Sequence, residues 1–391
     1  MPRALLLGLF YASVFIGTGA SLPYMPVWFR AHGLSGAQIS IILAAPMLAR
    51  VVIAPMLAVW ADSFVLRRTP MMLLGLAAGL CFGLIGLVSG FGPWLLFWLA
   101  ASSFLSTIIP LADVLTLRRA RTEGFNYGLP RGIGSIAFVA ANIGMGAVLA
   151  RAGPNGVIPW ICAAGLLAGL AAWTLLPPDL VHESGERPGR RDRWRGVGEL
   201  LRNRPFLLAV ISTSTIQATH AFYYAFSTLL WKAQGLSATL IGLLWATGVA
   251  AEIGFMWFFE PWRKRVGAET LVMVGGLAAL VRWTALAFVP PVWLLFPLQT
   301  LHALSFAAVF MGSLQLIERN APPHSASAAQ TISSAVSGGL AIGLATLASG
   351  PLFDAVQTRG YLAMSLLAAL GLVGAWRLAV AGRRRTVAGA S

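Results

Sequence analysis

The chain has 391 residues, of which 58% are hydrophobic and only 10% are charged. A soluble domain carries about 25% charged residues, so this sequence could not cover a water-facing surface. It could cover a lipid-facing one, which requires apolar side chains and a backbone that satisfies its own hydrogen bonds. We therefore predict an all-α polytopic membrane protein.

Twelve apolar runs follow one another along the chain, and each is about long enough to cross the ~30 Å hydrocarbon core as a helix. They are 5–29, 37–61, 70–90, 93–117, 128–150, 157–176, 206–231, 238–259, 270–290, 292–316, 327–353 and 359–379. The first run lacks a clear small-x-small cleavage site, so we interpret it as a retained helix and not as a secretory signal.

The basic residues determine the expected topology. With the N-terminus inside, 21 of the 28 Lys and Arg residues fall in inner connections and tails, and four fall outside. By the positive-inside rule both termini lie in the cytoplasm, and we expect the bacterial plasma (inner) membrane. The net charge of +15 is thus a topology signal, and we expect no nucleic acid as a partner.

Several function classes lack their sequence signals. The two cysteines, Cys81 and Cys162, lie inside apolar runs and are predicted to be small core residues, with no disulfide or metal framework. We expect no cofactor. An intramembrane enzyme would need a nucleophile–base or metal cluster, which the scattered histidines do not offer. There is no Gly-x4-Gly-Lys loop for direct use of ATP.

A short stretch recurs after about half of the chain. Gly-Leu-Ser at 33–35 follows a short basic segment and precedes an apolar run, and Gly-Leu-Ser at 235–237 does the same. This indicates two six-span halves, 1–176 and 206–391, the second ending in a short basic tail. A basic cytoplasmic linker, 177–205, joins them. Parallel repeats of this kind are the layout of major facilitator halves, which bind substrate between them near mid-membrane.

The repeat also aligns two intramembrane charges of opposite sign. Arg50 and Glu252 lie equally far beyond Gly33 and Gly235. A charge in the bilayer core is costly and normally faces a partner or a cavity. A carboxyl group at such a place can gain and lose a proton, so Glu252 is the leading candidate for a proton carrier. The alternative is a structural ion pair of Glu252 with Arg131 or Arg50.

Two histidines within spans extend the polar set. His302 is one helical turn from Gln299, and we expect it to relay protons with Glu252; the alternative is a neutral histidine bonded to a carbonyl. His220 shares a helix face with Gln217 and Tyr224, which suits a site that holds a ring and orients its polar end. Three neighbouring aromatic residues are expected to face lipid or the interface: Phe222, Tyr223 and Phe226.

The remaining intramembrane charges are expected to pair or to bind substrate. Asp113 and Arg131 are predicted to form a gating or folding salt bridge. Arg282 either pairs with Glu252 or, like Arg50, meets an anionic substrate, since a guanidinium binds a carboxylate through two hydrogen bonds.

The segment 58–68, with the sequence AVWADSFVLRR, lies between the second and third apolar runs, where major facilitator proteins carry a loop pattern. It keeps Asp62, Arg67 and Arg68 but replaces the glycines and the first arginine of Gly-x3-Asp-Arg-x-Gly-Arg-Arg. We assign Asp62 to the gate, and a basic cytoplasmic loop is the alternative explanation.

The whole chain resembles the phenylpropionate permease branch of the major facilitator superfamily. The resemblance rests on PLADVL, YGLPRGIGS, HAFYYAF, WKAQGLSATLIGLLWATGVAAEIGF, ALVRWTAL and QTLHALSF. It implies a twelve-helix symporter that takes up protons with a small, aromatic or other organic acid. We expect the protein to act as a monomer in the lipid bilayer. The resemblance also supports seven characteristic positions: Arg50, Asp113, Arg131, His220, Glu252, Arg282 and His302. A proton-driven exporter of the same fold and a non-transporting receptor or scaffold are the alternatives.

Overall fold

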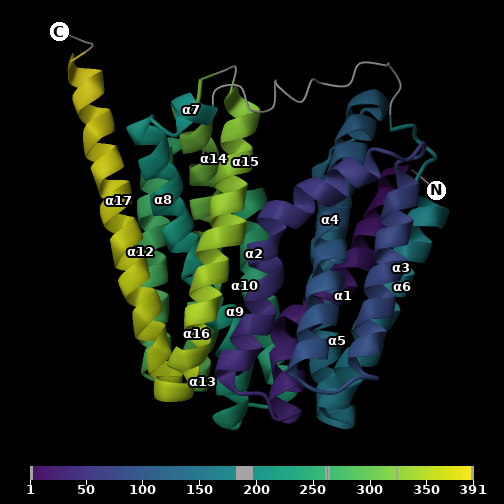
Figure 1. Cartoon of the computed structure of the whole chain (residues 1–391). Helices are drawn as coiled ribbons and strands as arrows, with labels where there is room; N and C mark the ends of the chain where they lie inside the picture. Colours follow the sequence, from purple (N-terminus) through teal and green to yellow (C-terminus); the bar gives the residue numbers. More distant parts are fainter. Residues whose placement is uncertain (1–2, 182–196, 260–261, 263–264, 323–324, 389–391) are drawn as a thin grey trace. The chain divides into compact units, whose positions relative to one another are not determined.

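The computed structural model describes residues 3–181, 197–259, 262, 265–322 and 325–388, and the predicted apolar runs are helices (Figure 1). The first six runs correspond to single helices. These are α1 (Arg3–Ala31), α2 (Gly36–Ala61), α3 (Arg68–Ile85), α4 (Phe91–Glu123), α5 (Gly128–Ala152) and α6 (Val157–Leu175). A one-turn helix, η1 (Pro154–Gly156), precedes α6.

The second set of runs is more interrupted. Its helices are α7 (Val197–Leu200), α8 (Arg204–Ala218), α9 (His220–Ala233), α10 (Ala238–Phe258), α12 (Ala268–Ala287), α13 (Val292–Thr300), α14 (Val309–Asn320), α15 (Ala326–Ala335), α16 (Ile342–Val356) and α17 (Tyr361–Ala388). Two π-helical turns, η3 (Ala303–Ala308) and η5 (Val336–Ala341), join α13 to α14 and α15 to α16. A short turn, η6 (Gln357–Gly360), precedes α17.

Ten helical stretches of the described chain are long and apolar enough to cross a membrane. The number is lower than twelve for two reasons. The predicted seventh span is divided into α8 and α9, each of which is too short to count alone, and the eleventh and twelfth spans merge into one stretch, Ala328–Val380. Helices therefore occupy all twelve predicted spans.

The division of the seventh span falls at Thr219. Its hydroxyl donates a hydrogen bond to the Ile216 carbonyl at 2.6 Å and accepts one from the Trp283 indole at 2.8 Å. A threonine that bonds back to its own helix competes with the regular backbone pattern. The tertiary bond from Trp283 holds this interruption in place.

The described residues form two compact units. The first comprises Met1–Glu186 with Tyr224–Ala246, and the second comprises Arg187–Tyr223 with Thr247–Ser391. The predicted organisation into halves 1–176 and 206–391 stays a prediction, as does the linker at 177–205, most of which (182–196) lies outside the described residues.

The repeated Gly-Leu-Ser stretch forms the same turn twice. Gly33 and Gly235 have φ values of 88° and 84°, in the left-handed region that glycine adopts without strain. The next residue donates its N–H back to the preceding helix in both turns, Leu34 to Phe29 at 3.2 Å and Leu236 to Trp231 at 3.1 Å. The serine hydroxyls then accept N–H bonds at the start of the following helix. Helix ending and helix start are thus encoded in three residues.

Glycines bring α3 and α6 of the first unit into close contact. Gly75 and Gly79 lie four residues apart on α3, and Gly165 and Gly169 do so on α6. A methyl group at Gly165 would lie 2.6 Å from the Gly79 nitrogen, and one at Gly75 would lie 2.5 Å from the Gly169 nitrogen. The two helices therefore touch backbone to backbone, as small-xxx-small motifs permit in membranes.

We expect Gly165→Leu to destabilise the protein by about 1–3 kcal/mol, because an added side chain must push α3 and α6 apart. Thermal unfolding of the purified protein in detergent measures the effect. Gly92→Leu is the matched control, since the same side chain there would meet open space. Equal unfolding temperatures for the two variants would contradict this account of the α3–α6 contact.

Candidate functional site

A buried guanidinium lies at the centre of the second unit. Arg282, on α12, is fully buried. It donates one hydrogen bond to Gln299 Oε1 at 2.6 Å and another to His302 Nδ1 at 3.1 Å. Its guanidinium carbon also lies 4.6 Å and 4.5 Å from the ring centres of Tyr223 and Trp283. Aromatic faces attract a cation, so these rings offset part of the cost of removing the charge from water.

The contact with Arg282 fixes the tautomer of His302. A guanidinium nitrogen only donates hydrogen bonds, so His302 Nδ1 must accept one and carries no proton. In the neutral ring the proton is then on Nε2, which lies 3.5 Å from Glu252 Oε2. Glu252, on α10, keeps 21% of its side chain exposed, whereas His302 keeps 8%. The three residues form a line, Arg282–His302–Glu252, in which the acid is the most accessible member.

His220 is oriented by a second chain of hydrogen bonds. Its Nδ1 lies 3.1 Å from the Gln217 carbonyl, which can only accept, so Nδ1 carries the proton. Its Nε2 therefore accepts the bond from the Ser305 hydroxyl at 3.2 Å. The rings of His220 and His302 lie 5.3 Å apart, edge to face. The structure thus assembles five predicted residues: His220, Glu252, Arg282, Gln299 and His302.

The local backbone explains how two helices approach so closely. Gly248 faces His302, and a methyl group at this glycine would lie 3.5 Å from His302 Cβ. The π turn η3 begins directly after His302 and carries Ser305. Such turns are rare and frequently occur at functional sites, because the extra residue changes which side chains face the neighbouring helix.

The prediction that Phe222, Tyr223 and Phe226 face lipid or the interface is wrong. All three are buried, with at most 2% of their surface exposed. Tyr223 covers the Arg282 guanidinium and donates its hydroxyl to Gln299 at 3.0 Å. Tyr224 instead stacks on Trp245 in the first unit, with ring centres 6.0 Å apart. The sequence did contain a signal for the position of Tyr223: an intramembrane arginine such as Arg282 attracts an aromatic face, so an aromatic residue was to be expected beside it.

The predicted Asp113–Arg131 pair lies in the first unit. Arg131 Nη1 is 3.9 Å from Asp113 Oδ1, at the limit of an ion pair. Asp113 is held more closely by two tyrosines that sequence reasoning missed, with Tyr11 donating at 2.5 Å and Tyr127 at 2.9 Å. The Arg131 guanidinium lies over the Tyr11 ring, 5.4 Å from its centre. Tyrosines are common in spans, so no sequence pattern marked these two.

Two further predicted residues have different surroundings. Arg50 is half-buried on α2, and within the described residues no hydrogen bond or ion pair reaches its guanidinium. Asp62 is the C-terminal cap residue of α2, and its backbone N–H bonds to Ala58. Asp62 thereby begins the connection that carries Arg67 and Arg68.

This connection holds the chain segment that follows α6. Arg67 donates from its backbone to the Asp179 carbonyl at 2.8 Å, and from its side chain to the carbonyls of Leu180 at 3.1 Å and Val181 at 2.8 Å. Arg68 donates to the Trp173 carbonyl at 3.2 Å and lies over the Trp173 ring. The two arginines retained from the loop pattern therefore bind the end of α6 and the residues after it.

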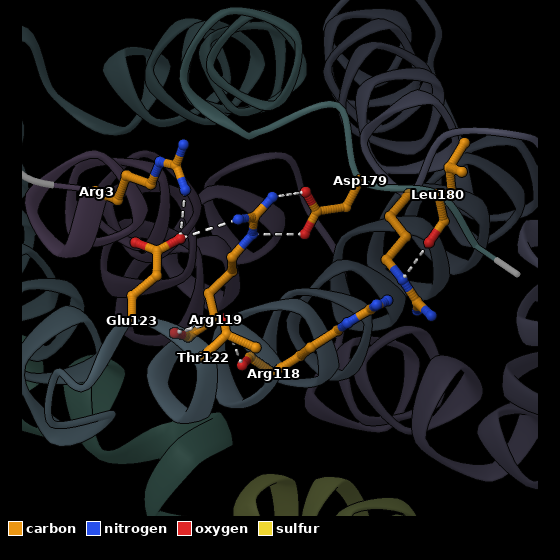
Figure 2. Close-up of polar contacts among 8 residues, drawn as sticks. Arg3, Arg118, Arg119, Thr122, Glu123, Asp179 and Leu180 are labelled. Atoms are coloured by element: carbon orange, nitrogen blue, oxygen red, sulfur yellow. Dashed lines mark hydrogen bonds and ion pairs between the residues drawn. The ribbon is translucent and has the colours of Figure 1, made fainter. Parts of the chain in front are cut away.

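Charges at the end of α4 complete this attachment (Figure 2). Arg119 lies between two carboxylates, with Nε donating to Asp179 at 2.8 Å and Nη1 to Glu123 at 3.0 Å. Arg3 also donates to Glu123, at 2.6 Å. The network links α1, α4 and the segment after α6 within the first unit.

The long apolar helices define a multi-pass membrane protein. A family model described as the MFS_1 like family matches residues 5–363, and the chain belongs to this family. It is a secondary transporter of the major facilitator type and not an enzyme.

Three curated relatives each align with 93% of the chain. They are uncharacterized transporter YwbF of Bacillus subtilis (28% identical, 90% of its length), the maltose permease of Geobacillus stearothermophilus (29%, 92%) and the probable 3-phenylpropionic acid transporter of Escherichia coli (26%, 94%). The crystal structure of the nucleoside transporter NupG has the same fold. Its TM-score is 0.81 at 17% identity, over 97% of this chain and 99% of that one.

We expect Arg282→Lys to lower the free energy of unfolding by about 2–3 kcal/mol, because a single ammonium cannot reproduce the guanidinium bonds to Gln299 and His302. Denaturant unfolding in detergent measures the change. Arg151→Lys, on the exposed end of α5, serves as the matched control and should have little effect. Similar stability of both variants would contradict the central position of Arg282.

Proposed function

We propose that the protein is a proton symporter that takes up a small organic anion, specifically an aromatic carboxylate. The observation that carries this proposal is the 3.5 Å approach of Glu252 Oε2 to His302 Nε2 inside two membrane-spanning stretches. An ionisable side chain at this depth is costly and is retained for a function. Glu252 is the group that binds and releases the proton.

The charges of the line Arg282–His302–Glu252 give a reason why proton binding and anion binding are coupled. With Glu252 ionised, the positive charge of Arg282 and the negative charge of the carboxylate balance across a neutral His302. Protonation of Glu252 leaves one net positive charge in a region of low dielectric, which attracts an anion more strongly. Proton and anion therefore favour each other's binding, and linkage makes this effect equal in both directions.

In this proposal His302 connects the Arg282 guanidinium to the Glu252 carboxylate, and its ring does not itself gain or lose a proton. A proton on Nδ1 would remove the acceptor that Arg282 uses and would place two positive charges 3.1 Å apart. The ring therefore stays neutral while it links Arg282 to Glu252. Arg282 has no exposed surface, so it acts on the anion through its charge and through the position of His302.

Arg50 supports an anionic substrate. The other two intramembrane arginines have acidic groups within reach: Asp113 for Arg131, and Glu252 through His302 for Arg282. Among the described residues Arg50 has no such ion-pair partner, and a guanidinium can bind a carboxylate through two hydrogen bonds. In the second unit, the further substrate contact in this proposal is Gln217, which keeps 9% of its surface exposed; His220 and Gln299 have no exposed surface and act as positioning residues for Gln217 and Arg282.

The relatives suggest two kinds of substrate. One is called a probable 3-phenylpropionic acid transporter and another a maltose permease. The balance of buried charges favours the carboxylate over the neutral sugar. The distribution of Lys and Arg further supports an orientation with both termini on the cytoplasmic side of a bacterial plasma membrane. We propose that this transporter acts as a monomer.

Uptake of labelled 3-phenylpropionate into vesicles containing the purified protein tests the proposal. An inward proton gradient of about one pH unit should support up to about tenfold accumulation for one proton per substrate. Glu252→Gln should abolish this accumulation but retain exchange between internal and external substrate, because exchange needs no net proton movement. Apparent substrate affinity should rise as the pH falls in the wild type and stay constant in the variant.

Labelled maltose serves as the matched substrate control and should not accumulate. Accumulation of maltose without 3-phenylpropionate would contradict the anionic substrate while leaving proton coupling in place. Gradient-driven accumulation that persists in Glu252→Gln would contradict the assignment of the proton to this residue. Accumulation of 3-phenylpropionate that occurs only with an outward proton gradient would identify a proton-driven exporter instead.

A further inference from the structure

An apolar groove of about 560 Å³ lies in the second unit, lined by residues of the same helical elements that carry the line Arg282–His302–Glu252 but by none of these three residues. The end of α10 and the residues after it form one wall through Gly254, Phe258 and Trp262. Val274 of α12 and Leu304 of η3 form the opposite side. Its volume is in the range of pockets that hold small ligands.

The surroundings of the groove are those of a lipid-exposed surface. Its walls belong to helical stretches that are long and apolar enough to span a membrane. Large aromatic side chains at its rim are strongly exposed, with Phe258 at 77% and Phe259 at 53%. An apolar concavity of this size in contact with hydrocarbon would be filled, because an empty one loses dispersion contacts on every side. A hydrocarbon chain matches its lining.

A positive charge lies within one helical turn of Trp262, one of the residues that line the groove. Trp262 lines the groove, and a helical hydrogen bond of 3.1 Å from Val266 N–H to the Trp262 carbonyl closes the turn that contains Arg265. Arg265 is exposed, and the sequence preceding it is Arg263-Lys264. Basic residues at the end of a spanning helix attract the head groups of anionic lipids. Aromatic residues next to them are typical of the membrane interface.

We propose that this groove binds one acyl chain of an anionic membrane phospholipid, with the head group beside Arg265. The site is independent of the transported substrate. The chain lies along α10, where Gly254 provides the depth: a methyl group at this glycine would meet no atom within 4 Å. A lipid bound here contacts Ala251 and Ala303, the sequence neighbours of Glu252 and His302.

Photolabelling of the full chain in lipid nanodiscs tests the site. The probe is phosphatidylglycerol with a diazirine in one acyl chain, added in trace amounts to phosphatidylcholine. Peptide mapping by mass spectrometry should find the label concentrated in residues 251–262 and 300–304. Gly254→Leu should reduce labelling there by about tenfold, which corresponds to a loss of roughly 1.4 kcal/mol in binding. Gly92→Leu, also in open space on a spanning helix, should leave labelling unchanged.

A second pair of measurements isolates the head group. Arg265→Gln replaces an exposed side chain, so it should fold, and it should weaken labelling by the anionic probe. The same diazirine on phosphatidylcholine should label the groove less than the phosphatidylglycerol probe. Two results would contradict lipid binding in the groove. One is label spread evenly over the exposed faces of all spanning helices, and the other is undiminished label in folded Gly254→Leu. Equal labelling by both head groups would overturn the role of Arg265.

Discussion

The burial of one guanidinium is the constraint around which the second unit is organised. Arg282 has no exposed surface, and a positive charge in this setting is tolerated only if its donors and its charge are compensated. Gln299 and His302 accept hydrogen bonds from its terminal nitrogens, and the faces of Tyr223 and of its own neighbour Trp283 cover the guanidinium. Because Arg282 holds the histidine in one tautomer, Glu252 is left as the acidic neighbour of its protonated nitrogen.

The two units treat their intramembrane charges differently. In the first, Asp113 receives two tyrosine hydroxyls, and Arg131 lies near it at 3.9 Å, an arrangement that keeps the carboxylate occupied by donors. In the second, Glu252 approaches a neutral imidazole, a much weaker stabiliser of negative charge than a cation. This contrast agrees with a structural role for the Asp113 carboxylate and with the proton-carrying role that we propose for Glu252.

The fold was largely predictable from the sequence and the assembled site only partly. Apolar runs reveal spans because hydrocarbon thickness sets their length, and Glu252 was noticeable because charges there are rare. The break at Thr219 and the π turn after His302 depend on contacts between distant helices, which no local pattern records. Ser305 was missed for the same reason, since a serine within a span is ordinary until its partner is known.

Proton uptake on substrate binding is the most direct test of the line Arg282–His302–Glu252. The purified protein in weakly buffered detergent solution, with a pH-indicator dye, would be titrated with 3-phenylpropionate. We expect proton uptake by the wild type, none by Glu252→Gln, and continued uptake by His302→Gln, whose amide can accept from Arg282 and donate to Glu252. Loss of uptake in His302→Gln together with its persistence in Glu252→Gln would contradict the account and assign the proton to the histidine.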